Sequence, residues 1–131
     1  MRAEPITVGM RDFTQLRVWE RSHRLTLAVY KATAAFPREE QYGLKSQMRR
    51  CCASVPANIA EGCGRGSNAD LARFLQMALG SASELQYQLL LARDLSLMNP
   101  HDFEDLTGEV TEIKRMLTFF IENLRAFANQ T

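Results

Sequence analysis

The centre of the chain carries Ser54-Val55-Pro56-Ala57-Asn58-Ile59-Ala60-Glu61-Gly62, followed directly by Cys63-Gly64-Arg65-Gly66. Around and before this segment, apolar residues recur every three or four positions, as they do on one face of an α-helix. These residues are Leu44, Met48, Cys51, Cys52, Val55 and Ile59. Three glycines within five residues can adopt left-handed backbone conformations that end a helix. We therefore predict a helix from residue 38 to about residue 61, with a sharp turn after it.

Pro56 lies inside this predicted helix. Proline has no amide hydrogen, so the carbonyl of Cys52 loses its partner within the helix. We expect the helix axis to bend near Pro56 for that reason.

Three further segments show helical periodicity. The first covers residues 13–35 and ends at Phe36-Pro37, because the residue before a proline is disfavoured in the α region. The second begins with Ser67 as a cap and Asp70 in the first turn, and Asn99-Pro100 is expected to end it. The last covers residues 103–127 with an almost continuous three-and-four spacing. The sequence predicts an all-α, antiparallel up-down four-helix bundle over residues 13–131, preceded by a flexible arm at residues 1–12 in which Met10 is an alternative start.

The composition is that of a globular domain, with 46% hydrophobic and 24% charged residues in 131. No apolar run approaches the roughly 20 residues that span a bilayer, and the start lacks a signal peptide. We expect a cytoplasmic protein without a membrane partner. The three cysteines, Cys51, Cys52 and Cys63, include an adjacent pair and have only His23 and His101 as further soft ligands. We expect reduced thiols, no metal site and no cofactor.

Charge is divided unevenly along the chain. Residues 1–65 hold eleven Lys/Arg against six Asp/Glu, whereas residues 66–131 hold five against nine, and the total is +1. A nucleic-acid surface on such a chain has to be local, in the arginine-rich first half.

A polar line follows one side of the helix predicted for residues 38–61, beside a face of small residues, Ala53, Ala57 and Ala60. With Glu84 from the next helix, we expect it to form a buried polar network of Gln47, Arg50, Ser54, Asn58, Glu61 and Glu84. Two interpretations stay open. The network fixes helix register or a subunit interface, or the site near the glycine turn binds the phosphates of a nucleic acid through Arg49, Arg50, Arg65 and Arg73.

The segment at residues 13–35 carries two apolar sets, and a single bundle needs only one of them for its core. Leu16, Trp19, His23, Leu27, Tyr30 and Ala34 form one set, and Val18, Leu25, Val29, Ala32 and Phe36 form the other. We expect the second set to contact another subunit. The candidate interface is therefore Val18, Leu25 and Val29 together with Ala53, Ala57 and Ala60.

Catalytic signals are weak. A carboxylate among arginines, as expected for Glu61 and Glu84, has its pKa lowered and is poorly suited to proton transfer at neutral pH. His23 lies on an apolar stripe, and no nucleophile with a neighbouring base can be recognised. We predict a protein that is not an enzyme and has no small-molecule substrate.

Several segments together resemble a known family. They are Gln41-Tyr42-Gly43-Leu44-Lys45-Ser46-Gln47-Met48-Arg49-Arg50, the Ser54–Gly62 segment, Leu16-x-Val18-Trp19, Arg73-Phe74-Leu75 and Ala78-x-Gly80-Ser81-x-x-Glu84-Leu85. In these residues the chain resembles the four-helix-bundle proteins encoded in 23S ribosomal RNA intervening sequences. The resemblance implies a bacterial cytosolic protein that forms a ring of five bundles. It also implies similarity to accessory proteins of diversity-generating retroelements, which bind nucleic acid and a reverse transcriptase.

Two functions follow as hypotheses. The first is an oligomeric scaffold or interaction protein linked to ribosomal RNA or ribonucleoprotein. The second is direct nucleic-acid binding through a local arginine-rich ring surface.

Overall fold

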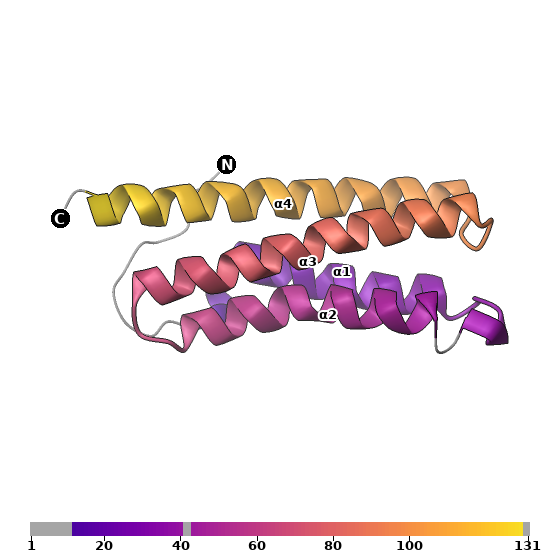
Figure 1. Cartoon of the computed structure of the whole chain (residues 1–131), viewed down its shortest axis with the longest axis horizontal. Helices are drawn as coiled ribbons and strands as arrows, with labels where there is room; N and C mark the ends of the chain where they lie inside the picture. The colour runs from indigo at the N-terminus through magenta and orange to yellow at the C-terminus, as the bar shows by residue number, and fades with distance from the viewer. Residues whose placement is uncertain (1–11, 41–42, 130–131) are drawn as a thin grey trace.

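The computed structural model describes residues 12–40 and 43–129, and these are all-α, with no strand among them. Four helices lie side by side along the long axis of the molecule (Figure 1). They are α1 (Arg17–Thr33), α2 (Leu44–Cys63), α3 (Asn68–Asp94) and α4 (Pro100–Asn129), with short 3-10 helices η1 (Phe13–Gln15) and η2 (Arg38–Glu40). The predicted arm, including Met10, lies outside the described residues apart from Asp12, which caps η1 through its side chain.

In the contacts between neighbouring helices, residue numbers rise along one helix as they fall along the other. Tyr30 meets Arg49 and Thr26 meets Cys52, so the residue number rises on α1 as it falls on α2. Gln86 contacts Lys114 and Arg93 lies over Phe103, which gives the same order for α3 and α4. Figure 1 shows the same course, since the colour advances along α3 in one direction and along α4 in the other.

The core is built from the apolar stripes of all four helices, and it corrects our assignment for the first one. Val18, Leu25 and Val29 are 0%, 3% and 0% exposed, so they face the core of their own bundle and are not an exposed subunit interface. The other set carries the exposed apolar surface, because Leu27 is 58% and Tyr30 is 44% exposed. The assignment was wrong because both sets have helical spacing, and spacing alone does not determine which set faces the core.

Helix α2 begins later than predicted and continues through Pro56. Residues 38–40 form the separate helix η2, and α2 starts at Leu44, whose amide donates to the Glu40 carboxylate at 3.2 Å. The carbonyl of Cys52, which Pro56 leaves without an amide partner, lies 3.4 Å from the Thr26 hydroxyl of α1. The expected bend of the axis stays a prediction.

The helix ends agree with the sequence in one place and differ in another. Ser67 caps α3 by accepting a hydrogen bond from the amide of Asp70 at 3.1 Å, as predicted. Asn99-Pro100 does not end α3, as we had expected, but begins α4, where the Asn99 side chain accepts from the amide of Asp102 at 2.8 Å. Helix α3 ends earlier, at a turn where Ser96 has φ 60° and the amide of Leu97 donates to the carbonyl of Ala92.

Gly62 sets how closely α2 and α3 approach each other. A Cβ atom at this position would lie 2.9 Å from Cβ of Phe74 and 3.0 Å from Cδ1 of Leu71. The two helices therefore meet at the glycine turn at a distance that no larger residue permits without movement.

In the part of the chain that the structure describes, none of the helices is both long enough and apolar enough to pass through a lipid bilayer.

Candidate functional site

The polar line on α2 is not the buried network that we predicted. Gln47, Arg50, Glu61 and Glu84 are all exposed, and only Ser54 and Asn58 are half-buried. The contacts there are local: the Asn58 amide donates to the Ser54 carbonyl at 2.8 Å, and the hydroxyls of Ser54 and Ser81 lie 2.5 Å apart. The prediction failed because the neighbouring alanine face is itself partly open, which leaves the polar line at the edge of the bundle.

The four predicted phosphate-binding arginines form two separate groups. Arg49 and Arg50 lie in the second turn of α2, and Arg65 and Arg73 lie at the glycine turn. At a rise of 1.5 Å per residue, the thirteen helical positions from Arg50 to Cys63, the last residue of α2, correspond to about 20 Å. The prediction that all four arginines surround the glycine turn is therefore wrong.

The pair at the glycine turn is occupied by local partners. Arg65 forms an ion pair with Glu61 at 3.5 Å, and Arg73 forms one with Asp70 at 3.6 Å. Both guanidinium groups also lie over the ring of Phe74, 4.9 Å and 4.6 Å from its centroid. Their charge is largely matched, and their side chains cover the buried Phe74.

The other pair borders a hollow of about 450 Å³. It is lined by Tyr30, Lys45, Ser46, Arg49 and Arg50. Arg49 is held in place, since its Nε donates to the Thr33 hydroxyl and its Nη2 to the Tyr30 carbonyl, both at 2.9 Å. Lys45 and Ser46 were not among the predicted site residues, although Lys45 and Arg49 are one helical turn apart and this spacing indicates a shared face.

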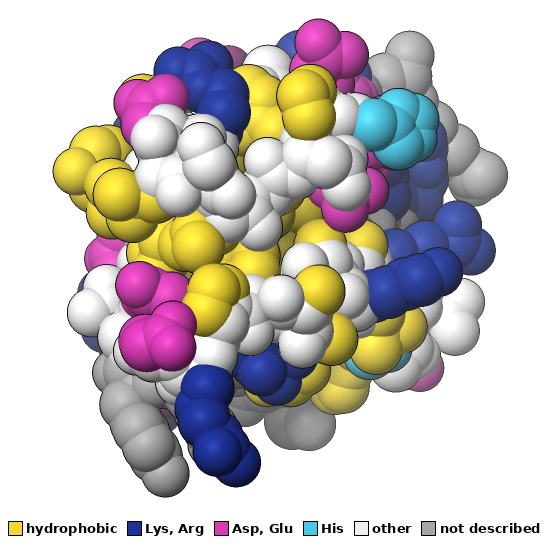
Figure 2. All heavy atoms as spheres, turned by 90° about the vertical axis from the view of Figure 1, so that its right-hand side faces the viewer, with side chains coloured by type: hydrophobic (Ala, Val, Ile, Leu, Met, Phe, Trp, Pro, Cys, Tyr) yellow, Lys and Arg dark blue, Asp and Glu magenta, His cyan; other side chains and the backbone are white. Residues whose placement is uncertain are grey.

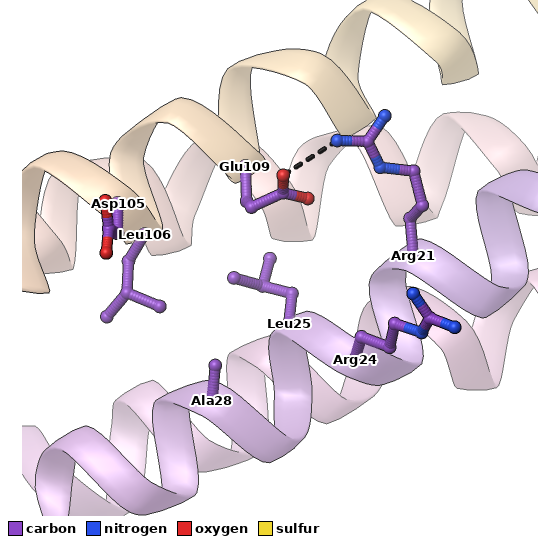
Figure 3. Close-up of a pocket in the computed structure, with 7 residues that line it drawn as sticks. All are labelled: Arg21, Arg24, Leu25, Ala28, Asp105, Leu106 and Glu109. Carbon is purple, nitrogen blue, oxygen red and sulfur yellow. Dashed lines mark hydrogen bonds and ion pairs between the residues drawn. The ribbon is translucent and has the colours of Figure 1, made fainter.

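A second hollow of about 440 Å³ lies between α1 and α4 (Figure 3). Leu25 and Leu106 point into it, and Arg21 closes one end by donating to the Glu109 carboxylate at 2.7 Å. It shares Ala28, Asp105 and Leu106 with a neighbouring hollow of about 410 Å³ that extends to Leu97 and Met98. Arg21 of α1 pairs with both Glu109 and Glu112 of α4, at 2.7 Å and 3.7 Å, so the charge at this end of the hollow is matched.

Two exposed apolar areas lie on different sides of the bundle. The first, which we call the α1–α2 face, consists of Leu27 and Tyr30 with the alanines of α2, Ala53, Ala57 and Ala60. The α3 face consists of Tyr87, 61% exposed, and Leu90, 39% exposed. Beside these two residues is a hollow of about 370 Å³ that is lined in part by Ser83 and Phe103.

The end of the bundle that carries the α3–α4 turn shows a mixed surface. In the space-filling view of this end, hydrophobic side chains are visible between the charged ones (Figure 2). Leu95, 53% exposed, lies in this turn.

The cysteines are unsuited to act as nucleophiles. Burial, together with the nearby Glu84 carboxylate, raises the pKa of the Cys51 thiol to about 12, and burial raises the pKa of Cys52 to about 11. The Cys51 thiol donates to the Ser81 carbonyl at 3.0 Å. Among the described residues there is no group of His, Cys, Asp and Glu that could hold a metal ion.

Comparison with known proteins gives two findings. The family model for the 23S rRNA-intervening sequence protein matches residues 14–119. A crystal structure of a protein of unknown function from the S23 ribosomal protein family of Bacteroides thetaiotaomicron is similar, with a TM-score of 0.72 and 26% sequence identity over 80% of this chain and 95% of that one. A search of curated proteins finds no match.

Proposed function

The chain belongs to the 23S rRNA-intervening sequence protein family, and from this premise we propose that it is a non-enzymatic, antiparallel four-helix bundle whose copies form a ring. The ring acts as a scaffold or interaction protein in the bacterial cytoplasm. The family name and the S23 title of the similar structure support a link to ribosomal RNA or ribonucleoprotein.

The observation that supports assembly is the pair of unlike exposed apolar areas. Arg49 lies over Tyr30, 4.5 Å from the ring centroid, and shares a side of α2 with Ala53, Ala57 and Ala60. On the α1–α2 face Leu27 is more exposed than Tyr30, 58% against 44%. The α3 face offers an open hollow beside Tyr87 and Leu90.

Unlike faces favour head-to-tail contact between copies. A contact in which one face meets a different face on the next copy produces a closed ring when the rotation between copies divides a full turn. We propose that Leu27 of one copy packs beside Tyr87 and Leu90 of the next. The number of copies, five, is taken from the resemblance to the family.

The experiment compares two leucines of similar exposure. Leu27→Glu places a charge on the α1–α2 face, whereas Leu95→Glu makes the same change in the α3–α4 turn, outside both faces. Light scattering is expected to give an assembled mass for Leu95→Glu and the mass of one chain for Leu27→Glu, with helix content unchanged in both. An assembled mass for Leu27→Glu would reject this face as the contact.

The second candidate function is direct nucleic-acid binding through the arginine-rich surface. The observation that favours it is the hollow at Tyr30, which among residues 12–40 and 43–129 is lined by Lys45, Arg49 and Arg50 and by no carboxylate. Binding of this kind weakens steeply as salt concentration rises, because condensed counterions are released from the phosphates. Affinity for single-stranded RNA that does not change with salt would argue against this function.

A further inference from the structure

Three cations meet in the hollow at Tyr30 without a carboxylate to match them. Within the described residues, the side chains of Lys45 and Arg50 form no hydrogen bond or ion pair, and the two hydrogen-bond partners of the Arg49 side chain are a hydroxyl and a carbonyl. Six arginines elsewhere each have a carboxylate within 4.0 Å: Arg21, Arg24, Arg65, Arg73, Arg93 and Arg115. The hollow therefore carries three positive charges that no ion pair with a described carboxylate neutralises.

Neither Glu40 nor Glu84 forms an ion pair with the cations of this hollow. Glu40 accepts a hydrogen bond from the amide of Leu44 and does not line the hollow. Glu84 lines the adjoining hollow on the other side of Arg50 and accepts from Gln88 at 3.2 Å, without an ion pair to Arg50.

Arg49 is also positioned in advance of any ligand. Its Nε–H and one Nη–H hold the Thr33 hydroxyl and the Tyr30 carbonyl, and the guanidinium lies over the Tyr30 ring. The remaining N–H donors stay available for a further acceptor. A ligand therefore does not have to order this side chain, which lowers the entropic cost of binding.

We infer that the hollow formed by Lys45, Ser46, Arg49 and Arg50 is a phosphate-binding site. A phosphate offers several acceptor oxygens, which suit an ammonium, two guanidinium groups and a hydroxyl arranged around one hollow. The hollow is open to solvent, so the phosphate can be a free ion or part of a nucleic-acid backbone. Binding of a nucleic-acid backbone at this site rests on the second candidate function, direct nucleic-acid binding. Binding of a free phosphate ion does not.

The test pairs two double variants with the same change in net charge. Lys45→Gln/Arg50→Gln removes two of the unmatched cations, and Arg24→Gln/Arg115→Gln removes two exposed arginines that already have carboxylate partners. Fluorescence anisotropy with labelled single-stranded RNA at low salt is expected to show a roughly ten-fold loss of affinity for the first variant, and a salt slope smaller by about 1.4. The second variant is expected to bind like the unmodified protein.

Inorganic phosphate separates the two sources of the ligand. Displacement of RNA by phosphate beyond that by chloride of equal ionic strength supports a site for the free ion as well as the polymer, and equal displacement supports a site for the polymer alone. If RNA does not bind but phosphate raises the melting temperature of the unmodified protein and not of Lys45→Gln/Arg50→Gln, the phosphate site stands and the nucleic-acid function fails.

Three results would overturn the inference. The first is an equal effect of the two double variants, which would reflect net charge alone. The second is the absence of any response to RNA or to phosphate. The third is loss of the assembled mass in Lys45→Gln/Arg50→Gln, which would assign these cations to a subunit contact.

Discussion

The two ends of α2 carry similar residues and differ in what those residues do. At the glycine turn, Arg65 has a carboxylate partner and covers Phe74, next to the close contact at Gly62. In the first turns of the helix, Lys45 and Arg50 border a hollow that none of the described carboxylates lines. The same residue type thus has its charge matched by a local carboxylate at one end, whereas Arg50 at the other end has no such partner among the described residues. The difference arises from the neighbouring carboxylates, not from the arginine itself, because a guanidinium lies over an aromatic ring at both ends.

The largest effect is expected at the close contact of the glycine end. Gly62→Ala forces Cβ against Phe74 and Leu71, so the free energy of unfolding should fall by about 1–3 kcal/mol. Gly108→Ala in α4 is the matched control, because a Cβ there meets nothing within 4 Å. That variant should gain up to about 1 kcal/mol, since alanine favours helix over glycine. Urea unfolding measures both, and a neutral Gly62→Ala would mean that the two helices separate without cost.

A smaller contrast is expected between arginines at the two ends. Arg49→Ala removes two hydrogen bonds that join α1 to α2 and should cost about 1–2 kcal/mol. Arg65→Ala removes an exposed ion pair and should cost less than about 1 kcal/mol. Urea unfolding of both variants at two salt concentrations measures these losses in the free energy of unfolding. Equal losses for both variants would contradict the structural role that we assign to Arg49.

The smallest effect is expected in the α3–α4 turn, when it is compared with the glycine turn between α2 and α3. The α2–α3 turn places a glycine at positive φ, Gly66 at 84°, whereas the α3–α4 turn places Ser96 at 60°. Ser96→Gly relieves the steric cost of a left-handed residue and should raise stability by up to about 1 kcal/mol. Calorimetry should show a higher melting temperature, and a lower one would indicate that the serine side chain stabilises the turn.

Much of the fold could be predicted from the sequence, because long periodic segments and helix caps are local signals. Four helices were expected, and the Ser67 cap is confirmed. Asn99-Pro100 was predicted to end α3 but begins α4. Asparagine before the first residue and proline at the first residue are both typical of a helix start, whereas proline is also common just after a helix ends. The inward side of α1 also could not be deduced. The buried stripe includes Ser22, whose hydroxyl is satisfied by the Trp19 carbonyl at 2.9 Å, and nothing local distinguishes it from the stripe of Leu27 and Tyr30.

The candidate site was only partly predictable. The sequence identified Arg49 and Arg50 as cations on one helix, but it did not separate them from Arg65 and Arg73. That separation depends on which arginines have a carboxylate neighbour in three dimensions, as Arg73 has in Asp70. The open edge of α2, which exposes Glu61, likewise depends on how the bundle packs.

If copies assemble through two unlike apolar faces, the unmodified protein in solution has the mass of a closed ring. Sedimentation analysis over a range of concentrations is expected to give one discrete mass near five times the 14.9 kDa chain. That mass should not grow with concentration, because a closed ring has no free face left. A mass of one chain at micromolar concentration, or a mass that increases continuously, would contradict the account.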